Sequence, residues 1–258
     1  MHYRDDAQAT MSTAEVMTVA LTAAAYYGGN LETSRTFLHE HGYMPHMLSQ
    51  SRLNRRLHAI PPLLWQGLFV LLAEVFKQHN SAQTYVVDSL PVPVCDNIRI
   101  RRCRLYPRAQ HGDTFRGYIA SKRRYFYGLR VHLVVSGQGE PVEFSLAAGS
   151  EADVTRFRDL DLDLPAGCTI YADRAYTDYD YEDVLEAAGL HLQAQRKKNS
   201  KRPFPLWREF VGQPIRQYIE TVFSQVTNGF PKHIHAVTPQ GFELKIVCFL
   251  LVFAIQCL

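Results

Sequence analysis

The sequence predicts an α/β domain with a mixed sheet flanked by helices, preceded by a small helical domain. Three observations carry this prediction. The first eighty residues repeat apolar side chains at helical spacing, residues 84–146 have the composition of strands, and strands alternate with helices from residue 152 onward. A chain of 258 residues with 47% apolar content is long enough to bury a core. We expect the helical domain over residues 1–80 and the α/β domain over residues 81–258.

Four helices are expected in the first domain. Ser12 and Glu15 form a capping-box pattern at the start of the first helix, which apolar residues at helical spacing continue. The others are expected over residues 32–41, 49–58 and 63–76, each bounded by glycine or proline. This part of the chain therefore reads as a small helical bundle.

The helix expected over residues 49–58 carries arginines beside an apolar face. Leu53 and Leu57 supply the apolar side chains, whereas Arg52, Arg55 and Arg56 supply the charge. Many helical bundles carry solvated arginines. Two interpretations therefore stay open, a basic helix that binds DNA and an ordinary exposed face.

The first strand of the second domain is expected over residues 84–87, ending at Asp88. Pro91 and Pro93 follow, and a central strand does not accept proline. The later elements are expected as two paired strands, a helix, a strand, a helix, a strand and a helix. They cover residues 125–135, 141–146, 152–160, 168–172, 179–188, 190–193 and 215–228.

Two further segments complete the expected organisation. Residues 196–214 hold three prolines and are expected to form an irregular basic insertion. The apolar run over residues 246–258 is shorter than the roughly 20 residues that a membrane span requires. A buried terminal helix and no membrane contact are therefore expected.

Charge is sorted along the sequence, although the formal net charge is only +3. Residues 99–130 hold ten Arg and Lys against one acid, residues 140–190 hold thirteen acids against three arginines, and residues 196–216 hold seven basic residues against one acid. Two basic blocks around an acidic one indicate a surface that binds a polyanion near a site that needs carboxylates. Two solvated faces are the alternative.

The basic blocks contain the side chains that we expect to contact DNA phosphates, which fix position rather than sequence. Phe204 and Trp207 in the second block could stack on an unpaired base or could anchor the segment to the core. The expected contacts are Arg99, Arg101, Arg102 and Arg104, then Lys197, Lys198 and Lys201.

The five cysteines form no CxxC pair, so a reducing, cytoplasmic location is expected rather than a disulfide framework. A zinc site from Cys95, Cys103 and His111 is disfavoured. Seven residues separate each neighbouring pair, unlike the short paired spacings of structural zinc sites.

Two aspartates stand where apolar strands are expected to end. In α/β sheets ligands gather at the carboxyl ends of strands, so Asp88 and Asp173 are expected at one rim, with Glu220 supplying a third carboxylate from a later helix. Carboxylates suit Mg²⁺ or Mn²⁺, and two such ions can stabilise the attacking and leaving oxygens of phosphoryl transfer. Alternatively, each aspartate is a turn former or a helix N-cap.

Six short stretches carry a resemblance to a known family. They are Ser51–Leu57, Val87–Pro91, Cys95–Ile100, Tyr127–Leu133, Ala172–Tyr176 and Arg216–Ser224. Together they resemble the bacterial DDE transposases of insertion-sequence family 982, related more broadly to family 4. The resemblance runs from about residue 10 to the end of the sequence.

The resemblance implies a ribonuclease H-like catalytic domain whose three acids are Asp88, Asp173 and Glu220, with two Mg²⁺ or Mn²⁺ ions as cofactors. It implies an enzyme that exposes the 3′ hydroxyl ends of a transposon by metal-assisted hydrolysis and then joins each hydroxyl to target DNA. Arg216 matches the family's arginine one turn before the glutamate. Its alternative role is an ordinary ion pair with Glu220.

The sequence departs from family 4 relatives at two positions near the glutamate. The tyrosine expected three residues before Arg216 is Gln213, and the lysine expected seven residues after Glu220 is Thr227. Lys232 is a candidate displaced substitute. His132 has two interpretations, as a group near the acids or as a core residue.

The implied partners are double-stranded DNA, both the terminal inverted repeats of a transposon and the target, and a second copy of the chain in a homodimeric synaptic complex. The implied location is the bacterial cytoplasm. Two other interpretations stay open. One is a ribonuclease H-like nuclease without strand transfer, and the other is a catalytically silent transposase-derived DNA-binding protein.

Overall fold

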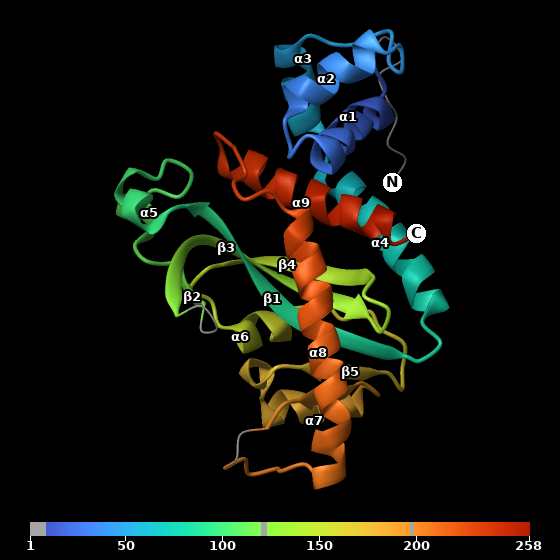
Figure 1. Cartoon of the computed structure of the whole chain (residues 1–258), viewed down its shortest axis with the longest axis vertical. Helices are drawn as coiled ribbons and strands as arrows, with labels where there is room; N and C mark the ends of the chain where they lie inside the picture. The colour runs from blue at the N-terminus through green and yellow to red at the C-terminus, as the bar shows by residue number, and fades with distance from the viewer. Residues whose placement is uncertain (1–8, 120–122, 197–198) are drawn as a thin grey trace. The chain divides into compact units, whose positions relative to one another are not determined.

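The chain divides into two compact units in the computed structural model, which describes residues 9–119, 123–196 and 199–258 (Figure 1). Unit 1 comprises residues 1–69 and 230–258, and unit 2 comprises residues 70–229. Within the long helix of unit 2, the side chains of residues 206–213, 215, 216 and 219 lie outside the described part.

Unit 1 is helical, as predicted for the N-terminal part of the chain. Its first helix begins with the predicted capping box, because the Glu15 N–H donates to Ser12 Oγ at 3.2 Å and the Ser12 N–H donates to Glu15 Oε2 at 2.7 Å. Its helices are α1 (Thr13–Tyr26), α2 (Leu31–Glu40), α3 (Gln50–Ala59), the first part of α4 (Pro62–His79) and α9 (Pro239–Gln256).

The helix α9 groups with the N-terminal helices and not with the sheet. It packs against α1, and seven of its residues, among them Phe242, Ile246 and Leu250, are buried. The predicted boundary at residue 80 therefore differs from the observed grouping, because α9 is apolar on most sides and has to be covered. Among the described helices, α9 alone has the length and apolarity of a membrane span, and core helices share these properties.

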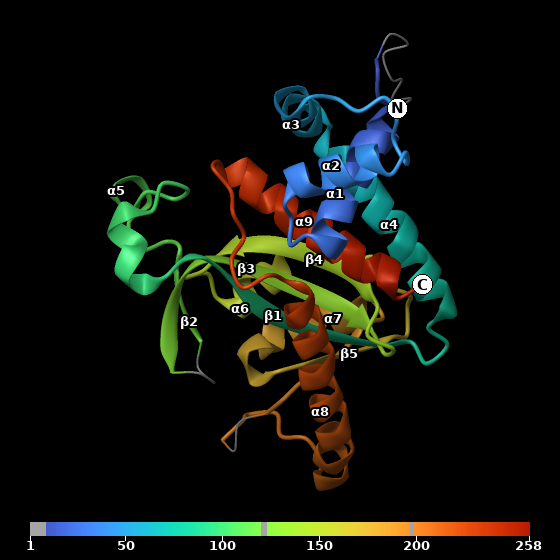
Figure 2. The same ribbon diagram turned by 45° about the horizontal axis from the view of Figure 1, so that its top comes forward.

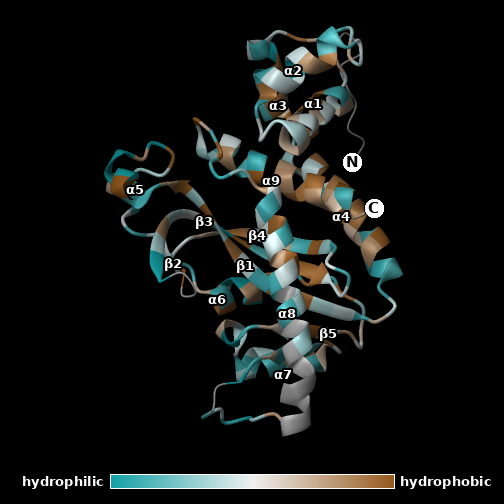
Figure 3. Cartoon of the chain, viewed as in Figure 1, coloured by the Kyte–Doolittle hydropathy of each residue, from teal (hydrophilic) through white to brown (hydrophobic). Residues whose placement is uncertain are grey.

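Unit 2 is an α/β domain with several short helices and one long helix around one sheet. Helices α6 and α7 are mostly hydrophilic in Figure 3. Besides the end of α4, its elements are β1 (Thr84–Cys95), the 3₁₀ turn η1 (Asn97–Arg102), α5 (Arg108–His111), β2 (Arg116–Ile119), β3 (Arg124–Ser136), β4 (Pro141–Ala148), α6 (Asp153–Arg158), β5 (Thr169–Ala172), the 3₁₀ turn η2 (Arg174–Tyr176), α7 (Tyr179–Ala187), β6 (His191–Ala194) and α8 (Leu206–Gly229).

The sheet is mixed, which confirms the predicted fold class. Strand β3 lies antiparallel to β1 on one edge, and its other edge is shared by β2 and β4. On the far side of β1, β5 and β6 run parallel to it. A sheet of antiparallel and parallel strands with helices packed on it is the arrangement expected of a ribonuclease H-like domain.

Strand β1 is longer than predicted, since it passes through both prolines and ends at Cys95. The prediction that it ends at Asp88 is wrong for a structural reason. Strand β5 pairs only with residues 84–87, so beyond Val87 the strand is paired on the β3 side alone. Proline is tolerated where one side of a strand is unpaired. Asp88 therefore lies inside β1, at the point where its parallel neighbour ends.

Helix α8 also begins earlier than predicted. Residues 206–214 are helical and not irregular, and Pro214 lies inside the helix. Proline removes one backbone hydrogen bond and usually breaks or kinks a helix, which is the basis of the expected break. The helix nevertheless continues through Pro214 and packs against β1, crossing the sheet in Figures 1 and 2. Tertiary packing here outweighs local propensity.

Gly128 lies where the backbones of β1 and β3 approach each other closely. A Cβ atom built at this position would lie 2.3 Å from the Val92 carbonyl oxygen and 2.8 Å from the Val94 nitrogen, at the irregular end of the β1 and β3 pairing. We predict that Gly128→Ala lowers the free energy of unfolding by about 1–3 kcal/mol, because the backbone has to move. Urea unfolding followed by circular dichroism measures this decrease.

Gly67→Ala is the matched control. A Cβ atom placed at Gly67 would have nothing within 4 Å, and the residue is inside helix α4. This change should raise stability by about 0.5–1 kcal/mol. Equal stability of Gly128→Ala and the unchanged protein would contradict the close packing.

Candidate active site

Asp88 and Asp173 follow neighbouring residues on two parallel strands. Val87 on β1 pairs with Ala172 on β5, and each aspartate is the next residue along the chain. The structure therefore brings together two carboxylates that are far apart in the sequence, as predicted. They lie at the carboxyl end of the parallel pairing, where α/β sheets commonly place their ligands.

Both aspartates accept a hydrogen bond from the residue that follows them. The Ser89 N–H donates to Asp88 Oδ1 at 2.7 Å, and the Arg174 N–H donates to Asp173 Oδ1 at 2.6 Å. Asp173 is also the N-cap of η2. Asp173 therefore has the N-cap role that was the alternative to metal binding, and this hydrogen bond fixes the orientation of its carboxylate.

The carboxyl group of Asp88 has a strongly perturbed pKa. Burial raises the pKa of its carboxyl to about 7, the nearby carboxylates of Asp153 and Asp173 raise it further, and the Ser89 N–H and Arg130 oppose these effects. Asp173 is exposed. One acid is thus largely shielded from water and the other faces solvent, and their negative charges repel each other.

Asp153 joins this pair from the first turn of α6. Its Oδ1 accepts a hydrogen bond from Ser89 Oγ at 2.8 Å and one from Arg130 Nη1 at 3.0 Å. The side chains of Arg130 and Asp153 are 16% and 17% exposed, so water screens this ion pair little. Neither Asp153 nor Ser89 was predicted from the sequence. The available signal was that Ser89 and Arg130 both lie in stretches that carry the family resemblance.

His132 lies two residues after Arg130, on the same face of β3. It is completely buried, and its Nδ1 is 3.9 Å from Asp153 Oδ1. Neither ring nitrogen has a hydrogen-bond partner in the described part of the chain. Burial lowers the pKa of its imidazole to about 4, and Arg130 and Arg156 lower it too, against the opposing effect of Asp153. His132 is therefore neutral and close to the acids.

Tyr176 closes the buried side of the cluster. It is 1% exposed, and its ring meets the Phe157 ring edge-on with centroids 5.5 Å apart. Burial raises the pKa of its phenol well above 10, and the carboxylates of Asp153 and Asp88 raise it further. The phenol of Tyr176 therefore stays neutral beside the two carboxylates.

The two aspartates fit a divalent metal, whereas the third predicted acid is not gathered with them. Repelling carboxylate oxygens, one of them withdrawn from water, are the donor set that Mg²⁺ or Mn²⁺ stabilises. Glu220 is exposed on α8. Across residues 9–119, 123–196 and 199–258, no three His, Cys, Asp or Glu side chains form a ready metal site. The side chain of Arg216 lies outside the described part.

The predicted DNA contacts fall into three places. On α3, Arg52 and Arg55 are exposed, Arg56 is partly buried, and Leu53 and Leu57 are buried as predicted. The arginines at 99, 101, 102 and 104 are all exposed on and just after η1, which with α5 projects beyond the sheet in Figures 1 and 2. Lys201 is exposed, and Lys197 and Lys198 lie outside the described residues.

The segment after β6 is anchored to α7. Arg196 forms a bidentate pair with Glu182, at 2.5 and 2.6 Å, and its guanidinium lies over the Phe204 ring at 4.5 Å. Arg202 pairs in the same way with Asp183. Phe204 thus has the anchoring role that was its alternative interpretation, and the side chain of Trp207 lies outside the described part.

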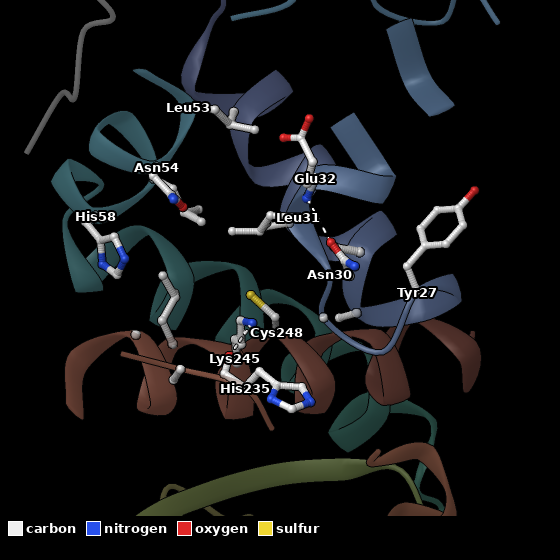
Figure 4. A pocket seen from close by; sticks show the side chains of 18 of the residues that line it. Tyr27, Asn30, Leu31, Glu32, Leu53, Asn54, His58, His235, Lys245 and Cys248 are labelled. Atoms are coloured by element: carbon white, nitrogen blue, oxygen red, sulfur yellow. Dashed lines mark hydrogen bonds between the residues drawn. The ribbon is translucent and has the colours of Figure 1, made fainter. Parts of the chain in front are cut away.

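Unit 1 has a separate pocket of about 600 Å³ between α1, α2, α3 and α9 (Figure 4). Its polar lining includes His58, His235 and Lys245, and Lys245 Nζ donates to the His235 carbonyl oxygen at 2.6 Å. Burial lowers the pKa of the Lys245 amine. The pocket contains none of the predicted acids, which all belong to unit 2.

The site consists of two acidic side chains at the carboxyl end of a parallel strand pair in a mixed sheet. The family described as "Transposase DDE domain" matches residues 78–234, which is more than half of the chain. The chain therefore belongs to the Transposase DDE domain family.

Two further comparisons accompany this assignment. No curated protein matches the sequence. Among solved structures, the piggyBac transposase in a synaptic complex with hairpin DNA is similar with a TM-score of 0.38 and 13% sequence identity. The match covers 78% of this chain and 46% of that one, so this chain spans about half the length of that transposase.

His132 provides a pH test of the site. Its folded pKa of about 4 is below its ordinary value of 6.5, so the unfolded chain binds the proton first as the pH falls. The contribution of His132 to the free energy of unfolding is therefore fully present above pH 6.5, and it is lost as the pH falls toward 4. Between pH 7.5 and pH 5 the unchanged protein should lose about 2 kcal/mol of unfolding free energy through this proton binding. The His132→Leu variant should not lose this amount.

Urea unfolding of both proteins at several pH values measures this difference. Curves of unfolding free energy against pH that stay parallel would contradict the buried, neutral imidazole.

Proposed function

We propose that this protein is a DNA transposase that cleaves transposon ends and joins the resulting 3′ hydroxyl to target DNA. The observation that carries the proposal is the placement of Asp88 and Asp173 at the end of the β1 and β5 pairing, in a chain of the Transposase DDE domain family. The resemblance to insertion-sequence family 982 supplies the finer assignment within that family.

The residues that would hold Mg²⁺ or Mn²⁺ are Asp88 and Asp173, with Glu220 as the proposed third ligand. Bound divalent ions would stabilise the attacking and the leaving oxygen of the phosphodiester. Asp173 faces solvent, from which a DNA strand approaches, whereas Asp88 is largely shielded. The hydrogen bonds from Ser89 and Arg174 orient the two carboxylates before any ion or DNA arrives.

The projecting segment of unit 2 supports DNA as the substrate. Arg101, Arg108 and Arg116 line one hollow together with Tyr125 and Ile98. The Arg116 guanidinium lies 4.3 Å from the centre of the Tyr125 ring, and Arg108 is held by Asp113 at 2.8 Å. Exposed guanidinium groups beside an exposed aromatic ring suit a phosphate and its neighbouring base.

The proposed partners are double-stranded DNA, as terminal inverted repeats and as target, and a second copy of the chain. The proposed location is the bacterial cytoplasm. A nuclease that cleaves without joining would use the same acids, so it differs from a transposase only in its product.

The decisive prediction concerns the three acids. Asp88→Asn, Asp173→Asn and Glu220→Gln should each reduce Mg²⁺-dependent cleavage of end DNA by at least about 1000-fold, because each change removes a charged oxygen ligand. DNA binding should be retained. The measurement is cleavage and joining of a fragment with a 3′ hydroxyl to a supercoiled plasmid, with binding followed by fluorescence anisotropy.

Asp161→Asn is the control, since this acid is exposed and outside the site. Joined product from the unchanged protein is expected, and cleavage without any joined product indicates the nuclease alternative. Cleavage at the unchanged rate by Asp88→Asn or Asp173→Asn would rule out the metal-dependent mechanism.

The arginines of η1 give a second prediction. Replacing Arg99, Arg101 and Arg102 together by alanine should weaken DNA binding and reduce the slope of log affinity against log salt by about 0.9 for each phosphate that is no longer neutralised. The measurement is an anisotropy titration from low to physiological salt. Arg158→Ala is the matched control, because Asp178 already binds that guanidinium. If the slope of log affinity against log salt is unchanged in the triple variant, these arginines do not contact the DNA.

A further inference from the structure

We propose that Asp153 is a positioning residue of the acid site, which holds Ser89 and Arg130 so that Asp88 presents its carboxylate to a divalent metal. The inference rests on the proposed function only in taking Asp88 and Asp173 as ligands of a divalent metal. Asp153 itself is assigned from contacts within unit 2.

A continuous chain of hydrogen bonds connects Asp153 to Asp88. Ser89 Oγ donates to Asp153 Oδ1 at 2.8 Å, and the backbone N–H of the same serine donates to Asp88 Oδ1 at 2.7 Å. Ser89 is therefore held at its hydroxyl by one acid while its N–H holds the other. Fixing the hydroxyl restricts the rotation of the serine and of the peptide group that donates to Asp88.

Arg130 fixes the far end of this chain. Its Nη1 lies 3.0 and 3.2 Å from the two carboxylate oxygens of Asp153, and it also donates to Ser89 Oγ at 3.3 Å. On the other side, its Nη2 donates to the Tyr118 carbonyl oxygen at 3.4 Å. The guanidinium is thus held between β2 and α6, and Asp153 cannot rotate without breaking a largely buried ion pair.

The strand register explains why these groups meet. Ser89 is directly opposite His132, and Pro91 is opposite Arg130, so Ser89, Arg130 and His132 share one face of the β1 and β3 pair. Helix α6 brings Asp153 to that face in its first turn. A one-residue shift of β3 would move both Arg130 and His132 away.

His132 supplies an independent observation at the same place. Its side chain is fully buried, it approaches Asp153 Oδ1 to 3.9 Å, and its two nitrogens have no partner among the residues that the structure describes. A buried polar group without a partner is uncommon in folded proteins. His132 therefore lies on the same strand face as Ser89 and Arg130 and beside the carboxylate of Asp153.

The proposal predicts a measurable effect on metal affinity. Partners behind metal ligands contribute about 10–100-fold to affinity or activity. Asp153→Asn and Ser89→Ala should each weaken Mn²⁺ binding to the full chain, without DNA, by about 10-fold or more. Because both act through Ser89, the double variant should bind about as weakly as the weaker-binding single variant, and their free-energy changes should not add.

Mn²⁺ binding is measured by electron paramagnetic resonance of the free ion, and cleavage of end DNA gives a second readout. Asp159→Asn, an exposed acid at the end of the same helix, is the matched control and should bind Mn²⁺ as the unchanged protein does. Thermal unfolding checks that each variant is folded. If Asp153→Asn does not fold, Ser89→Ala decides the question.

Unchanged Mn²⁺ affinity in a folded Ser89→Ala or Asp153→Asn variant would overturn the proposal, as would fully additive effects. Failure of the transposase assignment gives a different result, because Mn²⁺ binding would still depend on Asp153 while joined DNA product would be missing.

Discussion

The parallel register between β1 and β5 determines where chemistry can occur in this protein. The pairing ends at Val87 and Ala172, so Asp88 and Asp173 follow it side by side. Burial of Asp88 raises the pKa of its carboxyl to about 7, and repulsion from the nearby carboxylates raises it further. The surrounding Ser89 and Arg130 contacts offset part of this increase. A bound cation between the two carboxylates would reduce this repulsion.

The sequence predicted most elements of the fold, because buried strands and amphipathic helices leave clear local patterns. The hairpin of β3 and β4 and the capping box of α1 are found as expected. Two of the errors were caused by prolines, which placed the end of β1 and the start of α8. In β1 the effect of a proline depends on whether its missing N–H faces a partner strand, and in α8 packing against β1 outweighs the missing hydrogen bond.

The candidate site was partly predictable for a similar reason. Asp88 and Asp173 adjoin hydrophobic strands, so their neighbourhood in sequence indicates their position. The contacts of Asp153 join it to Ser89 and Arg130, which are 64 and 23 residues away, and no local pattern connects them. A first-turn aspartate of a short helix is also what ordinary helix electrostatics favours, so its sequence context gave no reason to single it out.

Unit 1 is assembled from two segments with the whole of residues 70–229 between them. Unit 2 is continuous in sequence, so it can form its sheet as soon as its own residues are available. Unit 1 has to wait for α9, whose buried residues Phe242, Ile246 and Leu250 belong to its core. During synthesis the part of α1 that packs against α9 therefore stays uncovered until the last helix is made, and exposed apolar surface at such a stage favours aggregation.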